Sequence, residues 1–378
     1  MNARTWLRPR PLLGLAVLWA LAGCQAAVPA VQHLPRYEGL LQRPLAERVQ
    51  PADAAVLDRA RVTNLTYGDD VRPRAANPAD PLARVVRAVL QALPPAVARL
   101  AGRHLAAVYL VQGDVGTATT EGVQDGAGRW GHAYIVLNLT ALARDANAWA
   151  AWKEGSAFRP SPGYALRVAI EPPEGDDRAG AVRFILLHEL GHVLGLALGV
   201  HGYWDDPAPE PPAATLRSAF VALSWAYAPA QGPRKAGMRS RHAERFPLLS
   251  GVAFYRFDAA PTALRDAPQV YAELAQTDFP SLYGTQGLFD DFAEAFVIFA
   301  HTRLLGRPYR VEVLHEGQPV QSFSSCIATG ACADKAAQIE ALLRGEPAAR
   351  LSSAGRASAP STSGAQVAGR GPRWTVSD

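Results

Sequence analysis

The stretch Phe184-Ile185-Leu186-Leu187-His188-Glu189-Leu190-Gly191-His192-Val193-Leu194 sets two histidines and a glutamate in an otherwise apolar run. On a helix, residues four apart lie one above the other on the same face, so both imidazoles can reach one metal ion. Glu189 lies about 100° round the helix from His188, where it can act on a water at the metal without binding the metal. Two neutral histidines, a carboxylate base and a water are the parts that a zinc hydrolase needs.

The residues around this motif predict a single helix from Arg178 to Ala197. Asp176 or Asp177 is a suitable N-cap, and Gly199 can end the helix. The helix is apolar on nearly every face, which predicts that it is buried, and buried histidines and carboxylates need partners. The alternative is a core helix whose histidines hydrogen-bond each other without any metal.

A mononuclear catalytic zinc takes three protein ligands, so the motif needs a third. The metzincin spacing has a histidine six residues after His192, where this chain has Leu198, and His201 follows the helix end as an expected surface histidine. The apolar spacing from Asp290 onward predicts a second amphipathic helix, on which Asp290 and Glu294 share a face. One of the two can bind the metal while the other hydrogen-bonds the far nitrogen of a ligand histidine. A solvated acidic helix start is the alternative.

Two stretches of the chain together resemble a known family. The motif from His188 to His192 and the segment from Ser281 to Phe296 are similar to the gluzincin zinc metallopeptidases, specifically the family of the anthrax toxin lethal factor catalytic domain. In that family a Ser-Tyr-Gly segment precedes a Phe-Ala-Glu-Ala-Phe helix at a fixed distance. Tyr283-Gly284 and Phe292-Ala293-Glu294-Ala295-Phe296 stand at that separation, with Leu282 in place of the serine. The resemblance covers residues 100–305 loosely and implies a zincin-like metallopeptidase domain.

The resemblance implies a role for each matching residue: zinc ligands at His188, His192 and Asp290, a general base at Glu189, an outer carboxylate at Glu294, and an oxyanion-stabilising hydroxyl at Tyr283. The family has a glutamate at the position of Asp290. Because an aspartate is shorter by one methylene, about 1.3–1.5 Å, its helix must approach the metal more closely, or Asp291 or Glu294 is the ligand instead.

The implied reaction is the hydrolysis of a peptide bond. A zinc-bound water, its pKa lowered toward ~7, would lose its proton to Glu189 and attack a carbonyl. Tyr283 and the metal would share the negative charge of the tetrahedral intermediate. Zincins of this kind hold the peptide along an edge strand, for which the alternating segment 131–139 is the candidate.

The first 24 residues have the features of a bacterial lipoprotein signal peptide. Arg4, Arg8 and Arg10 precede an apolar stretch too short to span a bilayer, which ends in Leu21-Ala22-Gly23-Cys24. This end resembles a lipobox, in which a lipid is attached to Cys24 and the chain is cut before it. Gln25 is not the aspartate that favours inner-membrane retention, so we expect an anchor in the outer membrane of the cell envelope. An ordinary secretory signal is the alternative.

Only Cys326 and Cys332 remain after this processing, and such a pair around a short glycine-containing loop predicts a disulfide in an exported chain. The net charge is +4, without a basic cluster interleaved with aromatic residues, so nucleic-acid binding has little support. With 49% hydrophobic residues among 378, the chain has enough apolar material for one catalytic domain with insertions.

The composition divides the chain into four parts: a signal peptide (1–23), a tether and N-terminal extension (24–80), a metallopeptidase domain (81–346) and a disordered tail (347–378). For the domain we expect an α+β fold, with a small mixed sheet and a mainly helical C-terminal half. The expected elements are helices at 81–93 and 96–103, and strands at 104–111, 131–139 and 165–170. A Pro-rich insertion from Tyr203 to about Gly232 separates the two motif helices and is expected near the cleft.

The leading hypothesis is therefore a zinc metallopeptidase that acts on a peptide or protein. Two other classes fit the sequence: a catalytically silent zinc-binding envelope lipoprotein, and a zinc hydrolase of a non-peptide envelope substrate. The intact Glu189 argues against the silent protein, because a scaffold has no need of the base.

Overall fold

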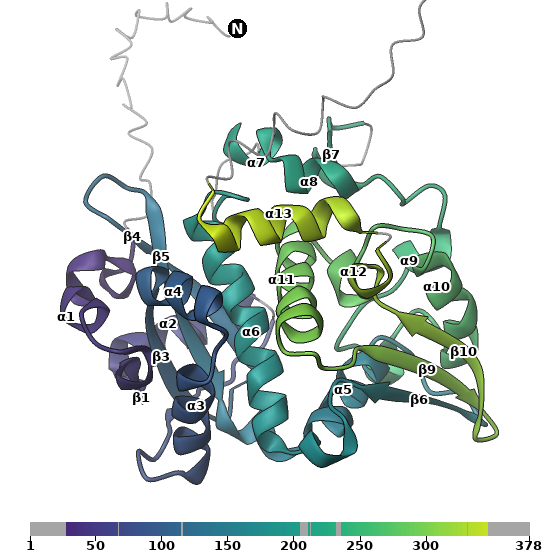
Figure 1. The fold of residues 1–378 in the computed structure, drawn as a ribbon, viewed down its shortest axis with the longest axis horizontal. Helices are drawn as coiled ribbons and strands as arrows, with labels where there is room; N and C mark the ends of the chain where they lie inside the picture. The colour runs from purple at the N-terminus through teal and green to yellow at the C-terminus, as the bar shows by residue number, and fades with distance from the viewer. Residues whose placement is uncertain are drawn as a thin grey trace, which may run out of the picture.

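The computed structural model describes residues 28–66, 68–114, 116–204, 211, 213–231, 236–330 and 332–346. Cys24 with its proposed signal peptide, and the tail expected to be disordered, lie outside these residues. The described part is a mixed α+β fold in which two small sheets lie on either side of a central pair of helices (Figure 1).

The first sheet has the strand order β1-β3-β5-β4. β1 (Val49–Pro51), β3 (Leu105–Gln112) and β5 (Trp130–Asn138) are parallel, and β4 (Ala118–Gln124) runs antiparallel to β5. A short β2 (Arg74–Ala75) also pairs with β3. The prediction of 131–139 as the edge strand is wrong, because β5 is enclosed between β3 and β4, and β4 forms the edge.

Helices cover both faces of this sheet. One face packs against α3 (Pro81–Gln91), α4 (Pro95–His104) and α6 (Arg178–Ala197) in the main core. The other face packs against α1 (Glu38–Leu41) and α2 (Ala54–Thr66) in a smaller core. The segment 28–51, expected as a tether, is therefore folded: it ends in a strand of the sheet and contributes buried side chains to the smaller core.

Helix α6 runs through the middle of the molecule and has the bounds that the sequence predicts. The carboxylate of Asp177 caps it by accepting from the backbone N–H of Gly180 at 2.8 Å, and Gly199 leaves it with a φ of 70°. The helix is long and apolar enough to cross a membrane, but 78% of its apolar window is buried inside the protein. The helix is apolar because most of its surface packs in the protein core.

The second sheet is antiparallel, with the order β10-β9-β6. It consists of β6 (Tyr164–Ala169), β9 (Arg310–His315) and β10 (Gln318–Ser324). Helix α5 (Ala146–Gly155) packs on β6, and α10 (Ala267–Leu274) packs on β10. The strand predicted at 165–170 is present, but it belongs to this separate sheet.

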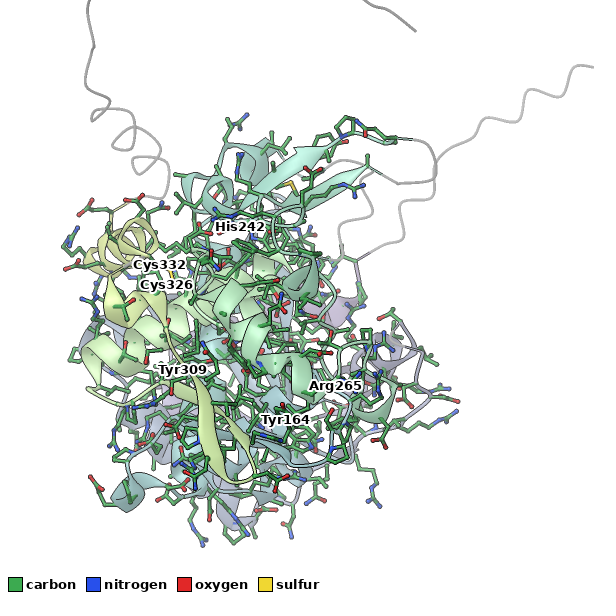
Figure 2. All side chains as sticks on the ribbon, turned by 90° about the vertical axis from the view of Figure 1, so that its right-hand side faces the viewer. Tyr164, His242, Arg265, Tyr309, Cys326 and Cys332 are labelled. Carbon is green, nitrogen blue, oxygen red and sulfur yellow. A yellow bond between two sulfur atoms is a disulfide. The ribbon has the colours of Figure 1, made fainter. Side chains whose placement is uncertain are left out.

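The C-terminal half is mainly helical, as expected. Helix α11 (Leu288–Phe299) packs along α6, and α13 (Ala333–Arg344) crosses over α11 (Figure 1). A disulfide between Cys326 and Cys332 joins α12 (Cys326–Thr329) to the start of α13, on the side of the molecule that also carries His242 (Figure 2). The expected insertion contains α7 (Ala213–Arg217), α8 (Ala219–Ser224) and β7 (Trp225–Ala228). After it come β8 (Gly237–Ser240), which forms a hairpin with β7, and α9 (Pro247–Ser250).

Short turns of 3-10 helix connect these elements: η1 (Ala30–Gln32), η2 (Leu34–Arg36), η3 (Leu45–Arg48), η4 (Leu139–Ala143), η5 (Pro173–Gly175), η6 (Phe257–Ala259), η7 (Leu264–Asp266) and η8 (Tyr283–Thr285). A turn of π-helix, η9 (Ala300–Leu304), extends α11.

Candidate metal centre

Helices α6 and α11 bring three potential metal ligands to one point. The Nε2 atoms of His188 and His192 lie 3.1 Å apart, and Oδ1 of Asp290 lies 3.8 Å from Nε2 of His192. One donor atom from each of the three side chains falls within 4.8 Å of the other two. Among the described residues, this is the one group of histidines, cysteines and carboxylates that is close enough to hold a metal ion.

The distances within this group and the neutral state of His192 fit a zinc ion, whereas Glu294 raises the pKa of His188 against the effect of burial, so a bound cation would have to displace the proton from that ring. Two nitrogens at 2.0–2.1 Å from a tetrahedral zinc stand about 3.3 Å apart, close to the observed 3.1 Å. Burial holds the pKa of His192 well below its usual value, so the ring is neutral as a ligand must be. Burial raises the pKa of Asp290 to about 6, with only partial relief from His188. A dication would supply the positive charge that this carboxylate lacks.

Glu294 lies on the Nδ1 side of His188, and both of its carboxylate oxygens have partners. Its Oε1 lies 2.9 Å from Nδ1 of His188, although this short contact lacks the alignment of a full hydrogen bond. Lys153 Nζ donates to the same oxygen at 2.9 Å, and Ser281 Oγ donates to Oε2 at 2.6 Å. Burial alone would raise the pKa of Glu294, but Lys153 and the hydrogen bonds outweigh it and hold that pKa far below the usual range. Glu294 is therefore an ionised carboxylate that orients His188.

Asp291 points to the opposite side of α11. Its two oxygens accept from Lys335 Nζ at 2.6 and 2.8 Å, and Oδ2 also accepts from Trp225 Nε1 at 3.0 Å. These contacts hold α13 and the hairpin of the insertion against α11. Of the three carboxylates that the sequence left open as ligands, Asp290 is the one that groups with both histidines within 4.8 Å, whereas Glu294 contacts only Nδ1 of His188.

The carboxylate of Glu189 is held by the edge strand of the first sheet. Thr120 on β4 donates its hydroxyl to Oε2 of Glu189 at 2.6 Å. Glu189 is only 6% exposed, and burial raises its pKa although His188 and Thr120 oppose this. Thr120 was not among the site residues predicted from the sequence, because the glycine-rich stretch 113–131, which contains β4, predicts a loop or hairpin.

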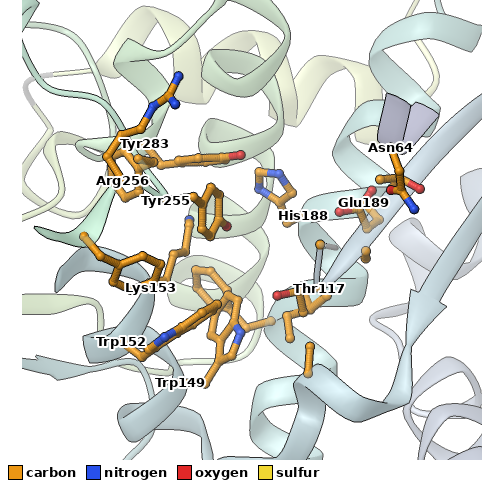
Figure 3. Close-up of a pocket in the computed structure, with 18 of the residues that line it drawn as sticks. Asn64, Thr117, Trp149, Trp152, Lys153, His188, Glu189, Tyr255, Arg256 and Tyr283 are labelled. Carbon is orange, nitrogen blue, oxygen red and sulfur yellow. The ribbon is translucent and has the colours of Figure 1, made fainter. Parts of the chain in front are cut away.

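A cavity of about 630 Å³ opens beside this group (Figure 3). Its wall includes His188 and Glu189 from α6 together with the start of β4. Seven aromatic residues also line it: Trp149 and Trp152 from α5, Phe184 from α6, Phe254, Tyr255 and Phe257 from the segment after α9, and Tyr283. A cavity of this size can hold one or two side chains of a substrate.

Tyr283 lies on η8 and faces His188. The two ring centroids are 5.7 Å apart, and the hydroxyl of Tyr283 points toward the His188 side of the cavity (Figure 3). Lys153 Nζ lies 4.1 Å from the centroid of the tyrosine ring, a cation–π contact. Burial raises the pKa of Tyr283 well above its usual value, so its hydroxyl keeps its proton and can donate a hydrogen bond.

The prediction that His201 is a surface residue is wrong. The chain turns back at Gly199, and the side chain of His201 packs against α6 at Gly195 and against the ring of Phe289, so that it is 1% exposed. Its Nδ1 hydrogen-bonds the carbonyl of Gly202 at 2.9 Å, and its Nε2 has no hydrogen-bond partner among the described residues. It does not join the group formed by His188, His192 and Asp290.

Lys153 was also not predicted as a site residue from the sequence. Its side chain lies between Glu294 and Tyr283. A usable signal was present: the chain has 38 lysines and arginines, but lysine occurs only at 153, 235 and 335. Lys153 and Lys335 are both buried, and each pairs with a carboxylate of α11. In a chain whose basic residues are mostly arginine, Lys153 and Lys335 therefore each mark a specific ion pair.

A search of known protein families, curated proteins and solved structures finds no match to this chain.

Proposed function

We propose that this protein is a zinc-dependent metallopeptidase of the gluzincin type, with residues 81–346 as its zincin-like domain. The observation that supports this most strongly is the meeting of His188, His192 and Asp290 beside the buried carboxylate of Glu189. Two imidazoles and one carboxylate are a ligand set of catalytic zinc, which leaves a fourth position for water or substrate.

His188, His192 and Asp290 would hold the ion, which when bound acts as a Lewis acid and lowers the pKa of a water toward ~7. Glu189 accepts a proton from the attacking water and returns it to the leaving amine. Thr120 keeps Glu189 in position through the 2.6 Å hydrogen bond. Tyr283 donates its hydroxyl to the carbonyl oxygen as negative charge develops there. Glu294, kept ionised by Lys153, fixes the orientation of His188.

The edge strand supports a peptide as the substrate. On one side β4 pairs with β5, and on the other, within the described residues, it forms only an isolated bridge between Gln124 and His33. An extended peptide can add to such an edge through its main chain, so that its scissile bond lies beside Glu189. A non-peptide substrate would make no use of this edge.

The test is digestion of an unbiased peptide library by the zinc-loaded protein, compared with its Glu189→Gln variant. We expect hydrolysis by the first and none by the second, with equal zinc content in both because Glu189 is not a ligand. Glu312→Gln on β9 is a matched control that removes a carboxylate from the second sheet. Hydrolysis that persists in Glu189→Gln, or a wild-type protein that takes up no zinc, contradicts the proposed function.

For the same protein we propose a lipid anchor at Cys24 in the bacterial outer membrane. Among the residues that the structure describes, the first buried apolar one is Val31, which follows Cys24 by seven positions. Even a fully extended connection would span no more than about 25 Å, so the domain would act close to the membrane surface. A Cys24→Ser variant should move from the membrane fraction to the soluble fraction of cells. An unchanged membrane fraction contradicts the anchor.

A further inference from the structure

The segment Phe254–Phe257 carries a second tyrosine to the cavity, and its backbone is strained. Tyr255 has a φ of 59° and Phe257 a φ of 48°, both in the left-handed region that favours glycine. For bulky aromatic residues this conformation is unfavourable. The surrounding structure must therefore hold the segment in place.

Ser156, directly after α5, accepts three backbone hydrogen bonds from this segment. Its Oγ accepts from the backbone N–H of Tyr255 at 3.0 Å, and its carbonyl accepts from Arg256 at 3.0 Å and Phe257 at 2.9 Å. The ring of Trp152, on the same helix, packs against the rings of Tyr255 and Phe257 with centroid distances of 6.1 and 5.8 Å. The helix that provides Lys153 to the site therefore also fixes the strained segment.

This segment places Tyr255 in the wall of the cavity. The residue is 45% exposed, yet it lines the same cavity as His188 and Glu189. In Figure 3 the hydroxyls of Tyr255 and Tyr283 both point toward the His188 side of the cavity. The two rings lie 6.2 Å apart at 79°. Among the described residues, the hydroxyl of Tyr255 has no hydrogen-bond partner.

We propose that Tyr255 is a second hydrogen-bond donor to the reacting carbonyl oxygen, acting together with Tyr283. This inference rests on the proposed peptidase function. As the oxygen of the attacking water bonds to the carbonyl carbon, the π-electron pair moves onto the carbonyl oxygen. The phenol of Tyr255 keeps its proton throughout and stabilises that charge by donation.

The electrostatic surroundings suit this role. Burial of the hydroxyl end raises the pKa of Tyr255 to about 12; Lys153 opposes the shift, and the carboxylates of Asp290 and Glu294 add to it. The group is therefore a neutral donor over the physiological pH range. A hydroxyl without a partner in the free protein can form its hydrogen bond when negative charge develops on the carbonyl oxygen. Such a bond stabilises the transition state more than the ground state.

The test compares two inhibitors that bind the metal differently. A phosphonopeptide places a tetrahedral, negatively charged oxygen where the carbonyl oxygen would be, whereas a thiol peptide binds through sulfur and has no such oxygen. Dissociation constants for both are measured on the zinc-loaded wild type and on the Tyr255→Phe, Tyr283→Phe and Tyr164→Phe variants. Tyr164 on β6 is the control, because it stacks on His315 in the second sheet.

We expect Tyr255→Phe to weaken phosphonopeptide binding about 10-fold or more and to change thiol binding less than about twofold. The kcat for a cleaved peptide should fall about 10- to 100-fold with KM nearly unchanged, because Tyr283 remains as a donor. Tyr164→Phe should alter none of these quantities.

Unchanged phosphonopeptide binding in Tyr255→Phe overturns the inference, as does an equal weakening of both inhibitors, which would show that Tyr255 only shapes the cavity. If the wild type binds zinc and both inhibitors, either result leaves the proposed function intact. A wild type that binds no zinc contradicts the proposed function itself, and the inference falls with it.

Discussion

Gly191 of α6 and Ala293 of α11 lie in direct backbone contact. A β-carbon added to Gly191 would lie 2.6 Å from Cα of Ala293, closer than such atoms approach in proteins. Gly191 stands between the two motif histidines, and Ala293 stands between Asp290 and Glu294. The contact therefore sets the distance between the two halves of the site. Because an aspartate reaches less far than the glutamate of the resembling family, Asp290 needs a close approach of this kind.

Replacing Gly191 with alanine should push α6 and α11 apart. We expect a loss of about 1–3 kcal/mol in the free energy of unfolding, from overpacking at the crossing. Zinc affinity should fall with it, because Asp290 moves away from the histidines. Urea denaturation and zinc titration measure the two effects.

Gly102→Ala is the matched control. Gly102 lies within α4, and a β-carbon there would meet nothing within 4 Å. Alanine should stabilise that helix by up to about 1 kcal/mol and leave zinc affinity unchanged. If Gly191→Ala behaves like this control, the contact does not position the site.

The three carboxylates of α11 should respond differently to amide substitution. Asp290→Asn should lose the most zinc affinity, because it removes the charge of the proposed third ligand. Glu294→Gln should lose about 10- to 100-fold, as expected for a group that orients a ligand histidine. Asp291→Asn should bind zinc normally but lose about 3–5 kcal/mol of stability, since Lys335 is left buried without its counter-charge. Isothermal titration and urea denaturation separate these effects. Equal zinc binding by Asp290→Asn and wild type would show that the third ligand has been misassigned.

Local sequence signals predicted the helices of the site well. The apolar run, the Asp177 cap and Gly199 are enough to define α6, because they all act within one element. The acidic and aromatic spacing after Gly287 likewise predicted α11 to within two residues of its start. Such signals work because capping and amphipathic periodicity are local.

The rest of the site depends on contacts between distant segments. Strand β4 was not predicted because Thr119-Thr120-Glu121-Gly122 lacks an apolar alternation; part of it is buried by the folded N-terminal segment, where Gln32 donates to Glu121 at 3.2 Å. Tyr255 lies after α9, between the two motif helices, and its backbone is anchored to Ser156, 99 residues earlier. No periodicity could reveal either contact.

The buried pair of Lys153 and Glu294 gives a prediction on stability. Lys153→Met should lose about 3–5 kcal/mol, because Glu294 is left charged and unpaired in the core. Adding Glu294→Gln should restore part of that loss, since the double variant has no buried charge at this point. A double-mutant cycle by urea denaturation, done without metal, gives the coupling energy. Losses that simply add would mean that the two groups do not interact.

Glu154 should make the stability of the metal-free protein depend on pH. Burial raises its pKa to about 7 from 4.5, although Lys153 opposes this and Tyr271 donates a hydrogen bond to its carboxylate at 2.7 Å. Between pH 4.5 and 7 the folded state therefore binds more protons than the unfolded state. By linkage, the free energy of unfolding falls as the pH rises through this window, by at most about 3 kcal/mol.

Glu154→Gln removes this titration while retaining an acceptor for Tyr271. The variant should match the wild type near pH 4 and become more stable than it above pH 7, as measured by urea denaturation across that range. A constant difference between Glu154→Gln and wild type from pH 4 to 8 would mean that Glu154 is already ionised at acidic pH. Lys153 would then neutralise two carboxylates, Glu154 and Glu294, rather than one.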